Sequence, residues 1–332
     1  FNSNAGGGNF SVNNVTIENI NAEQFLYVNE CSDTITSIDI GNCFFNDCSF
    51  SEEGGVLCFY DAEIKTINVT NSNFRNISAN DYASAIFIGN RKLENLNISG
   101  CEFFNCHANY DGGVIYIDQN NVYIGNNSSA SFDKNFIVKC YASGSCGGGI
   151  FSNGRYNTIE NFTFFDNVAK YGGAIYGDWN NLKIIGCSFY DNGADEIGGS
   201  VYINSSASEI HNSIIAWSRA GNVDEDDGGI DIYCDSSSYC QCDDNTFYVS
   251  GEGSFYHCNI TDAQKSSFPA VKFSDSRNYS GNNLIRGTSQ NNPIFISTTD
   301  DLYAMYINMA HRDFATYGNR HYLLTNPLHG FP

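Results

Sequence analysis

The chain contains 332 residues, of which 16 are Lys or Arg and 37 are Asp or Glu, so its formal net charge at pH 7 is −21. A charge of this sign and size repels DNA, RNA and anionic lipid surfaces, and it argues against all three as partners. The length slightly exceeds that at which one globular core stops growing, so two domains or a solenoid are expected.

Residues 1–9 are rich in Gly and Asn and are predicted to form a loop or cap that leads into the fold. An internal repeat follows over residues 10–235, with its clearest copies at 101–116, 161–176 and 187–202. The central apolar residues of its eight units lie 28, 29, 29, 34, 27, 25 and 26 residues apart. These residues are Ile17, Phe45, Phe74, Phe103, Ile137, Phe164, Phe189 and Ile215. A repeat of this period predicts a solenoid.

Other positions of the repeat form columns as well. Five residues after the centre stand Ala22, Phe50, Ala79, Ala108, Ala142, Ala169, Ala194 and Ala220. Five residues before it stand Val12, Ile40, Val69, Ile98, Phe132, Ile159, Ile184 and Ile210. Further on, a Gly column precedes an apolar run: Gly55, Gly113, Gly149, Gly173, Gly199 and Gly229, with Ala85 once.

Short bursts of alternating apolar residues, broken by Asn or Gly-Asn, predict β-strands with turns between them. Three short strands per coil of about 25–30 residues are typical of a right-handed parallel β-helix, in which like residues stack about 4.8 Å apart. We therefore predict an all-β fold of this type, with internal rows of Phe, Ala and Ile or Val. The Gly-Gly pairs are predicted to make tight corners, because Gly tolerates positive φ. Asn167 and Asn192 are predicted to stack and hydrogen-bond within one row.

The repeat fades after Tyr233. Residues 236–332 are predicted to form irregular, Cys-containing coils and a C-terminal cap, since the end of a solenoid must be covered. Strand-like bursts occur at 271–273 and 293–296, and residues 302–309 fit either a helix or a strand.

Thirteen cysteines without a CxxC pair or Cys/His ligand spacing indicate an oxidising, secreted or cell-surface environment rather than a zinc site. The cysteines could form disulfides or could fill internal rows of the core as small buried residues, and the sequence favours neither explanation. The disulfide candidates are Cys43, Cys48, Cys101, Cys106, Cys140, Cys146, Cys234, Cys240, Cys242 and Cys258. Cys106 and Cys140 fall in consecutive coils, close enough to form a bridge. The odd count leaves at least one thiol unbonded or available to another chain.

Eleven N-x-S/T sequons are candidate glycosylation sites. They begin at Asn9, Asn14, Asn68, Asn76, Asn97, Asn126, Asn127, Asn161, Asn204, Asn259 and Asn278. Those at Asn14, Asn68, Asn76, Asn97 and Asn161 fall at positions predicted to face outward. No apolar run approaches the length of a membrane span, and the chain begins with Phe. A mature secreted protein or an excised ectodomain is therefore expected, with any anchor outside this chain.

The segments FDKN (132–135), FFDN (164–167) and FYDN (189–192), together with GGAI (172–175), alternate at a fixed period. This pattern resembles the FxxN and GGA[ILV] repeats of the polymorphic outer-membrane proteins of chlamydiae, and it is similar to repeats in surface β-helix proteins of parasitic protists. The resemblance covers about residues 10–235 and implies a right-handed β-helix displayed outside the cell, often in adhesion. The sequons favour a protist relative made by a eukaryotic secretory route.

The densest carboxylate run lies at 224–227, close to Asp231. Asp224, Asp226 and Asp231 are weak candidates for a metal site, Ca²⁺ being the ion that carboxylates suit. A solvated acidic loop is the favoured explanation, because alternate side chains of an extended run point apart. The neighbouring Cys106–His107 and His257–Cys258 face opposite ways for the same reason, so they do not form nucleophile–base pairs. No catalytic residue and no cofactor is predicted.

The sequence thus predicts an extracellular, non-enzymatic β-helix module with an adhesive or structural role. Its expected partners are other surface proteins or glycans along its faces, and copies of itself at the solenoid ends. The alternative is a glycoside hydrolase or polysaccharide lyase on a pectate-lyase-like β-helix, whose site would be a carboxylate cluster. A polyuronate lyase would also need a cation beside the acids, where only Arg219 is close, and the charge of −21 opposes an anionic substrate.

Overall fold

The computed structural model describes fourteen parts of the chain, from residue 8 to residue 324. They are residues 8–29, 34–89, 92–126, 135–178, 181–204, 207–221, 229–235, 240–243, 245–249, 255–256, 258–260, 284–287, 294–296 and 322–324. Within these ranges every regular element is a β-strand. They contain no helix with the length and apolarity needed to cross a membrane.

The strands form three long sheets, here called A, B and C, and one pair. Sheet A contains β1 (Asn9–Asn13), β5 (Ile35–Gly41), β8 (Ile64–Thr70), β11 (Leu93–Ser99), β15 (Tyr123–Gly125), β19 (Thr158–Glu160), β23 (Lys183–Ile185), β27 (Ser208–His211), β31 (Cys240–Asp243) and β34 (Cys258–Ile260). Sheet B contains β2 (Thr16–Glu18), β3 (Asn21–Ala22), β6 (Phe44–Phe50), β9 (Asn73–Ala79), β12 (Glu102–Phe104), β13 (His107–Ala108), β16 (Asn135–Val138), β17 (Tyr141–Ala142), β20 (Phe162–Phe165), β21 (Val168–Ala169), β24 (Ser188–Tyr190), β25 (Gly193–Ala194), β28 (Ile214–Ala216), β29 (Arg219–Ala220), β32 (Thr246–Val249) and β35 (Leu284–Gly287). Sheet C contains β4 (Leu26–Asn29), β7 (Leu57–Tyr60), β10 (Ile86–Ile88), β14 (Ile115–Asp118), β18 (Ile150–Asn153), β22 (Ile175–Asp178), β26 (Val201–Asn204), β30 (Ile232–Cys234) and β33 (Phe255–Tyr256). The pair is β36 (Ile294–Ile296) with β37 (Tyr322–Leu324).

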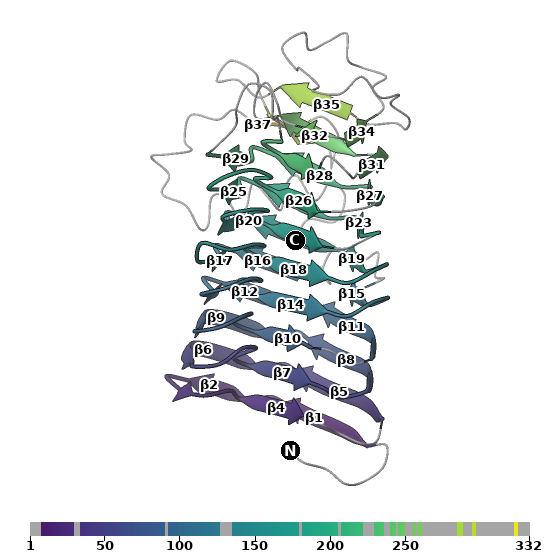
Figure 1. Cartoon of the computed structure of the whole chain (residues 1–332). Coiled ribbons are helices and arrows are strands. Elements are labelled where there is room, and N and C mark those ends of the chain that lie inside the picture. The colour runs from purple at the N-terminus through teal and green to yellow at the C-terminus, as the bar shows by residue number, and fades with distance from the viewer. Residues whose placement is uncertain are drawn as a thin grey trace.

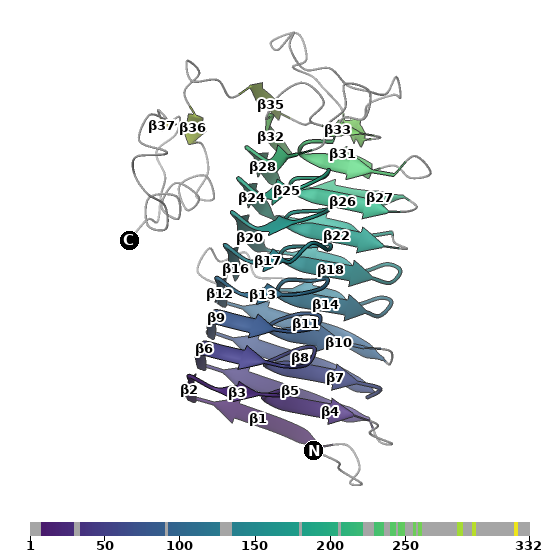
Figure 2. The ribbon, with the colours of Figure 1, turned by 60° about the vertical axis from the view of Figure 1, so that its left-hand side comes forward.

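Each coil passes through sheets A, B and C in turn, and each strand pairs in parallel with its equivalent in the next coil. Figure 1 shows the strands of sheet C stacked along the axis, and Figure 2 shows those of sheet B along one side of the same stack. This is the parallel β-helix with three strands per coil that the repeat predicts. The three sheets continue past residue 235, through β31 to β35.

The central apolar residues of the repeat lie above one another in the core. Phe45, Phe74 and Phe103 are in register, fully buried and stacked, with ring centroids 5.1 and 4.7 Å apart and ring planes within 13°. Register also joins Ile17 to Phe45, and Phe103 through Ile137, Phe164 and Phe189 to Ile215. The predicted internal row is therefore confirmed over all eight units. The Ala column is confirmed in the same way, as in the pairs Ala79–Ala108 and Ala169–Ala194.

Each coil turns at residues whose backbone is left-handed, with φ between +47° and +90°. Between sheets A and B they are Asn14, Asn42, Asn71, Gly100, Asn161, Gly186 and Asn212. At the bend within sheet B they are Asn19, Asp47, Asn76, Asn105, Lys139, Asp166, Asp191 and Trp217. Between sheets B and C they are Gly54, Ala83, Gly112, Gly147, Gly172, Gly198 and Gly229, which confirms the predicted glycine corners. Gly, Asn and Asp adopt this conformation at the lowest cost, so the turns account for much of the Asn content.

Buried asparagines repair the hydrogen-bond ladder around these turns. Asn167 accepts a bond from the main-chain N–H of Cys140 (2.9 Å) and donates to the carbonyl of Ile137 (2.8 Å), on either side of left-handed Lys139. Asn192 bridges Asn167 and Phe164 in the same way around Asp166. The same bridge is made by Asn135, Asn157 and Asn245. A buried main-chain group without a partner is costly, so these amides substitute for the missing strand pairing.

The predicted stacking of Asn167 and Asn192 is confirmed, because Nδ2 of Asn167 donates to Oδ1 of Asn192 at 3.0 Å. The segment FDKN is not equivalent to FFDN, however. Asn135 begins β16, two residues before Ile137, whereas Asn167 follows β20. The final Asn of both segments makes the same kind of bridge, but at different turns of the coil.

Two column assignments were wrong. The place predicted for Phe132 in sheet A belongs to Ile124, which is in register with Ile159, while residue 132 lies outside the described residues. Ile124 is also in register with Leu96 and not with the predicted Ile98, so the column shifts by two residues at this point. The long segment between β15 and β16 displaced the residue count. In the Gly column, register through sheet C places Ser84, Gly148 and Ile230 where Ala85, Gly149 and Gly229 were predicted. Each of these three positions in the Gly column was predicted one residue away from its place in the structure. The shift arises because consecutive small residues make the alignment of the repeats ambiguous.

Asn167→Asp tests the asparagine bridge. A carboxylate of the same size accepts the bond from Cys140 but cannot donate to Ile137, and burial disfavours its charge. We expect a loss of about 2–4 kcal/mol in the free energy of unfolding at pH 7. Because burial raises the pKa of the new carboxyl, the loss should shrink as the pH falls towards 4. Urea unfolding measures the loss of stability, and Asn105→Asp, at an exposed position, is the control. Equal losses in the two variants would contradict the role of Asn167 as a hydrogen-bond bridge.

Candidate functional surfaces

The outer face of sheet C carries an unbroken column of aromatic side chains, here called the aromatic row. It consists of Phe87, Tyr116, Phe151, Tyr176, Tyr202, Tyr233 and Tyr256, in register from β10 to β33. Alternation along each strand directs these side chains away from buried neighbours such as Ile86 and Ile115. Ring centroids are 4.7–5.2 Å apart and ring planes lie within 22°. The rings therefore cover each other's faces and present edges and hydroxyl groups to the outside.

A row of carboxylates and amides runs beside the aromatic row. Asp118, Asn153, Asp178 and Asn204 are in register, and the amides of Asn153 and Asn204 donate to Asp118 (2.9 Å) and Asp178 (3.0 Å). The same two amides hydrogen-bond to the hydroxyls of Tyr116 and Tyr176. Burial raises the pKa of both phenols, followed by the charge of Asp118 at Tyr116 and by Cys146 and then Asp178 at Tyr176. The two rows thus form one hydrogen-bonded strip along the axis.

Towards the N-terminal end the strip widens into a patch here called the aromatic platform, made of Tyr60, Tyr82, Phe87, Tyr110 and Tyr116. Tyr82 is tilted against Tyr110 by 35° and against Tyr116 by 53°, with centroids 5.4 and 5.0 Å apart. Tyr60 lies 6.1 Å from Phe87. The side chains of Tyr60 and Tyr110 are 40% and 53% exposed. Unlike the coaxial rings of the aromatic row, tilted and exposed rings leave face area open to a ligand.

Carboxylates surround the aromatic platform. The pKa of Tyr82 is raised by burial and then by the charges of Asp111, Asp81 and Glu53, which places those three acids close to its ring. An aromatic surface edged with hydrogen-bond acceptors combines apolar contact area with groups that can receive hydroxyl or ammonium donors. Contiguous exposed aromatic surface of this kind marks interaction sites in soluble proteins.

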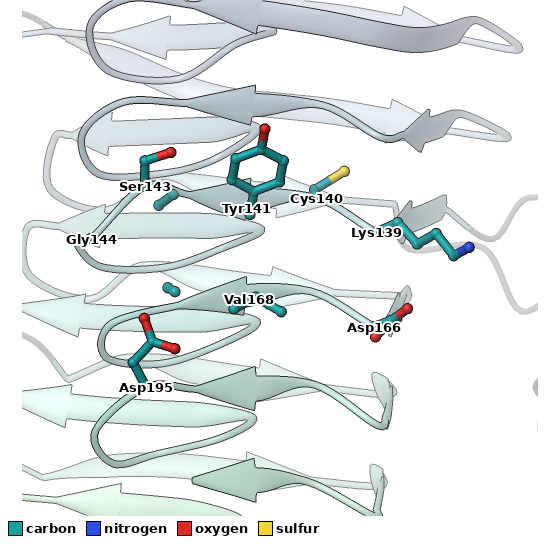
Figure 3. Close-up of a pocket in the computed structure, with 10 residues that line it drawn as sticks. Lys139, Cys140, Tyr141, Ser143, Gly144, Asp166, Val168 and Asp195 are labelled. Carbon is teal, nitrogen blue, oxygen red and sulfur yellow. The ribbon is translucent and has the colours of Figure 1, made fainter. Parts of the chain in front are cut away.

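A second candidate is a hollow of about 420 Å³ on the outer side of sheet B. Figure 3 shows Ser143 and Asp195 on loops at one side and Lys139 and Asp166 at the other, with Tyr141 above. The acids that line it are Asp166 and Asp195. Arg219 forms salt bridges with Oδ1 of Asp166 and with Oδ1 of Asp191, which does not line the hollow, each at 3.0 Å.

Of the predicted metal candidates, only Asp231 lies in the described part of the chain. Asp224 and Asp226 lie outside the described residues. Asp231 is 1% exposed, and its main-chain carbonyl accepts bonds from Ser200 and Val201, so it belongs to the core and not to a solvated loop. Among the described residues no three His, Cys, Asp or Glu side chains form a group that could hold a metal ion.

None of the twelve described cysteines takes part in a disulfide, and Cys31 lies outside the described residues. The thiols of Cys43, Cys48 and Cys101 donate to main-chain carbonyls of their own or the preceding coil at 3.2–3.8 Å. They fill internal rows as small buried residues, one of the two explanations that the sequence left open. Cys106 and Cys140 are neighbours, since the N–H of Cys106 donates to Sγ of Cys140 at 3.4 Å, but no bond joins their sulfurs.

The described sequons avoid the core, as the register predicts. Asn9, Asn14 and Asn76 are exposed, and the half-buried sequon residues are Asn68, Asn97, Asn126, Asn161 and Asn204. Asn68 and Asn97 are joined in an amide ladder, with Nδ2 of Asn97 2.8 Å from Oδ1 of Asn68. Asn127, Asn278 and the side chain of Asn259 lie outside the described residues. Glycosylation stays a prediction.

Comparison with protein-family models, curated proteins and solved structures found no match. The resemblance to chlamydial and protist surface repeats therefore depends on the repeat pattern alone. The structure supports its coarser implication, a repetitive parallel β-solenoid.

The aromatic row and the aromatic platform were missed in the sequence. The signal was present, because Tyr116, Tyr176 and Tyr202 end the apolar run in all three of the clearest repeat copies. Strand alternation would have placed them on the outside. The platform was harder to find, since Tyr60, Tyr82 and Tyr110 occupy different repeat positions and meet only in space.

Tyrosine ionisation should destabilise the protein at high pH. Burial raises the pKa of Tyr176 in the folded state, so its stabilising contribution is complete below the unfolded value of about 10 and is lost as the pH rises above it. We expect the free energy of unfolding to fall between pH 9 and 11, and to fall less steeply in Tyr176→Phe. Urea titrations at each pH provide the measurement. Tyr156→Phe, at a ring that is 57% exposed, is the control, and identical slopes in both variants would contradict the prediction.

Proposed function

We propose that this protein is a non-catalytic, extracellular module that binds neutral glycans through the aromatic platform. The observation that carries the proposal is the exposed cluster of Tyr60, Tyr82 and Tyr110 beside Phe87 and Tyr116. In it Tyr82 is tilted against Tyr110 and Tyr116, while Tyr60 stacks on Phe87 with ring planes within 9°. The C–H face of a pyranose packs against an open aromatic face, and the tilt between Tyr82 and Tyr110 offers two such faces at an angle. A rigid solenoid holds these rings in place before the ligand arrives, which lowers the entropic cost of binding.

Charge selects the class of glycan. Asp81, Asp111 and Glu53 lie near the ring of Tyr82, and the whole chain carries −21. Carboxylates accept hydrogen bonds from sugar hydroxyls but repel sulfate, uronate and sialate groups. The preferred ligands are therefore neutral oligosaccharides on cell surfaces, which agrees with the adhesive role implied by the family resemblance.

The proposal of a module without catalysis is supported by the state of the acids beside the hollow on sheet B. Hydrolysis of a glycosidic bond uses two carboxyl groups, one of them protonated to act as the acid. The salt bridges from Arg219 to Asp166 and Asp191 favour the ionised form of both groups. Assembly through the solenoid ends stays a prediction.

Binding to a panel of neutral oligosaccharides tests the proposal. The double variant Tyr60→Ala/Tyr110→Ala should bind the best ligand at least tenfold more weakly, because it removes the two most exposed rings of the platform. Isothermal titration calorimetry measures the dissociation constants. The matched control is Tyr141→Ala/Tyr156→Ala, whose rings are 37% and 57% exposed but lie outside the platform.

Two outcomes would contradict the proposal. Equal affinity of the two double variants would remove the platform as the binding site. Chain shortening of the bound oligosaccharide, followed by mass spectrometry over a day of incubation, would show that the protein is an enzyme.

Secretion has a separate test, the occupancy of the sequons after expression in a eukaryotic secretory pathway. We expect glycan at Asn14, which is exposed at a turn, and none at Asn97, whose amide nitrogen donates within the ladder to Asn68. Enzymatic removal of N-glycans in heavy-oxygen water marks each occupied Asn for peptide mass spectrometry. An unmodified Asn14 beside a fully occupied Asn97 would contradict the expectation, and Asn14→Gln provides the control peptide.

A further inference from the structure

Four cysteines meet in the core where the repeat becomes irregular. Cys234 ends β30 in sheet C, Cys240 and Cys242 lie on β31, and Cys258 begins β34. All four are between 0% and 4% exposed. Cys240 and Cys258 are in register on adjacent strands of sheet A, so the four cysteines, which lie on three successive coils, converge on one part of the core.

The four thiols contact one another in a closed ring. Sγ of Cys242 lies 3.9 Å from Sγ of Cys240. Cys240 also hydrogen-bonds to Cys234, and Cys258 hydrogen-bonds to both Cys234 and Cys242. Each thiol therefore contacts two others. We call these four cysteines the thiol ring. Cys258 also donates to the main-chain carbonyls of Tyr256 (3.3 Å) and Ile232 (4.0 Å), as the isolated core thiols of Cys43, Cys101 and Cys187 donate to theirs at 3.3–3.8 Å.

A metal does not explain the thiol ring. Structural zinc sites need four ligands that point at one central position. The described residues contain no group of three or more such side chains arranged to hold a metal ion, although all four cysteines lie among them. Thiols that each contact two other thiols suit covalent pairing instead.

We infer that the thiol ring is an oxidation site that forms two disulfides, Cys234–Cys240 and Cys242–Cys258. Only two sets of disulfides join neighbours in the ring: the inferred set, and the set Cys240–Cys242 with Cys234–Cys258. Cys240 and Cys242 are separated by two positions on one extended strand, where Cα atoms lie about 6.6 Å apart, near the upper limit for a disulfide. The inferred pairing instead joins residues on different strands and closes the segment between sheets C and A.

The redox step requires an oxidant, and we assign that role to the disulfide of a thiol–disulfide oxidoreductase in the secretory pathway. For each bond formed, two cysteine thiols lose two electrons and two protons, and the oxidant's disulfide is reduced to two thiols. Contacts with Cys234 and Cys242, followed by burial, raise the pKa of Cys240, and burial raises that of Cys258. The folded thiols are thus poor nucleophiles, so exchange should occur before these coils close.

Such bonds would serve the part of the solenoid that most needs them. A coil in a solenoid contacts only its neighbours, so coils near an end lack support on one side. The columns that stabilise the regular coils also fade here, as the sequence shows after Tyr233. Two cross-links between sheets and between successive coils would add covalent support where the repeated residues are missing.

Peptide mapping of secreted protein, alkylated in denaturant without reduction, tests the pairing. Lys and Arg are absent between Arg219 and Lys265, so trypsin releases all four cysteines on one fragment, 220–265. Chymotrypsin then cuts after Tyr233, Tyr239, Phe247 and Tyr256 and separates Cys234, the Cys240–Cys242 pair and Cys258. We expect three peptides linked into one by two disulfides. The pairing with Cys240–Cys242 would instead release that peptide alone, and would overturn the assignment.

Thermal unfolding with and without a phosphine reductant gives a second readout. The melting temperature of the wild type should fall by about 5 °C or more on reduction, and that of Cys234→Ser/Cys240→Ser should fall less. Cys106→Ala/Cys140→Ala, a neighbouring thiol pair outside the thiol ring, is the control and should retain the full shift. Four alkylated thiols without reduction, or one tightly held zinc ion per chain with all four thiols reduced, would overturn the inference.

Discussion

In-register parallel pairing between successive coils is the constraint on which this structure depends. Every residue has its equivalent directly above and below it, so a side chain must suit its own copy about 4.8 Å away. Phe stacks on Phe in the core, as in Phe45, Phe74 and Phe103, and Ala stacks on Ala at the end of sheet B. The same rule acts outside, where it lines up the tyrosines of sheet C into the aromatic row.

The turns set the second constraint, because a left-handed residue interrupts the strand pairing at each of them. Asparagine serves two purposes at these turns. Exposed asparagines such as Asn42 and Asn105 adopt positive φ, while buried ones such as Asn167 and Asn192 restore the main-chain hydrogen bonds. This gives a physical reason for the final Asn of the FxxN pattern, which is a core bridging residue and not a ligand-binding one.

On such a scaffold, candidate binding surfaces lie where the outward-facing rows of side chains become irregular. Coaxial rings in the aromatic row use their faces to stabilise one another, so the row mainly stiffens sheet C. Tyr82 and Tyr110 are tilted out of that order, and Tyr60 and Tyr110 keep much of their surface exposed. The thiol ring likewise forms where the repeat degenerates. In both places chemistry becomes available because the neighbouring coils no longer present identical residues.

The sequence by itself determined the β-helix, the internal Phe and Ala rows, the glycine corners and the outward placement of the sequons, because periodicity fixes which residues share a column. It misplaced Phe132 and one step of the Gly column, since counting cannot locate an insertion or resolve runs of small residues. Only the tertiary structure decided that Tyr60, Tyr82 and Tyr110 form a platform. It alone also showed that Arg219 forms salt bridges with Asp166 and Asp191, and that Cys234 contacts Cys258. These contacts join residues from different repeat positions and different coils, so no single period encodes them.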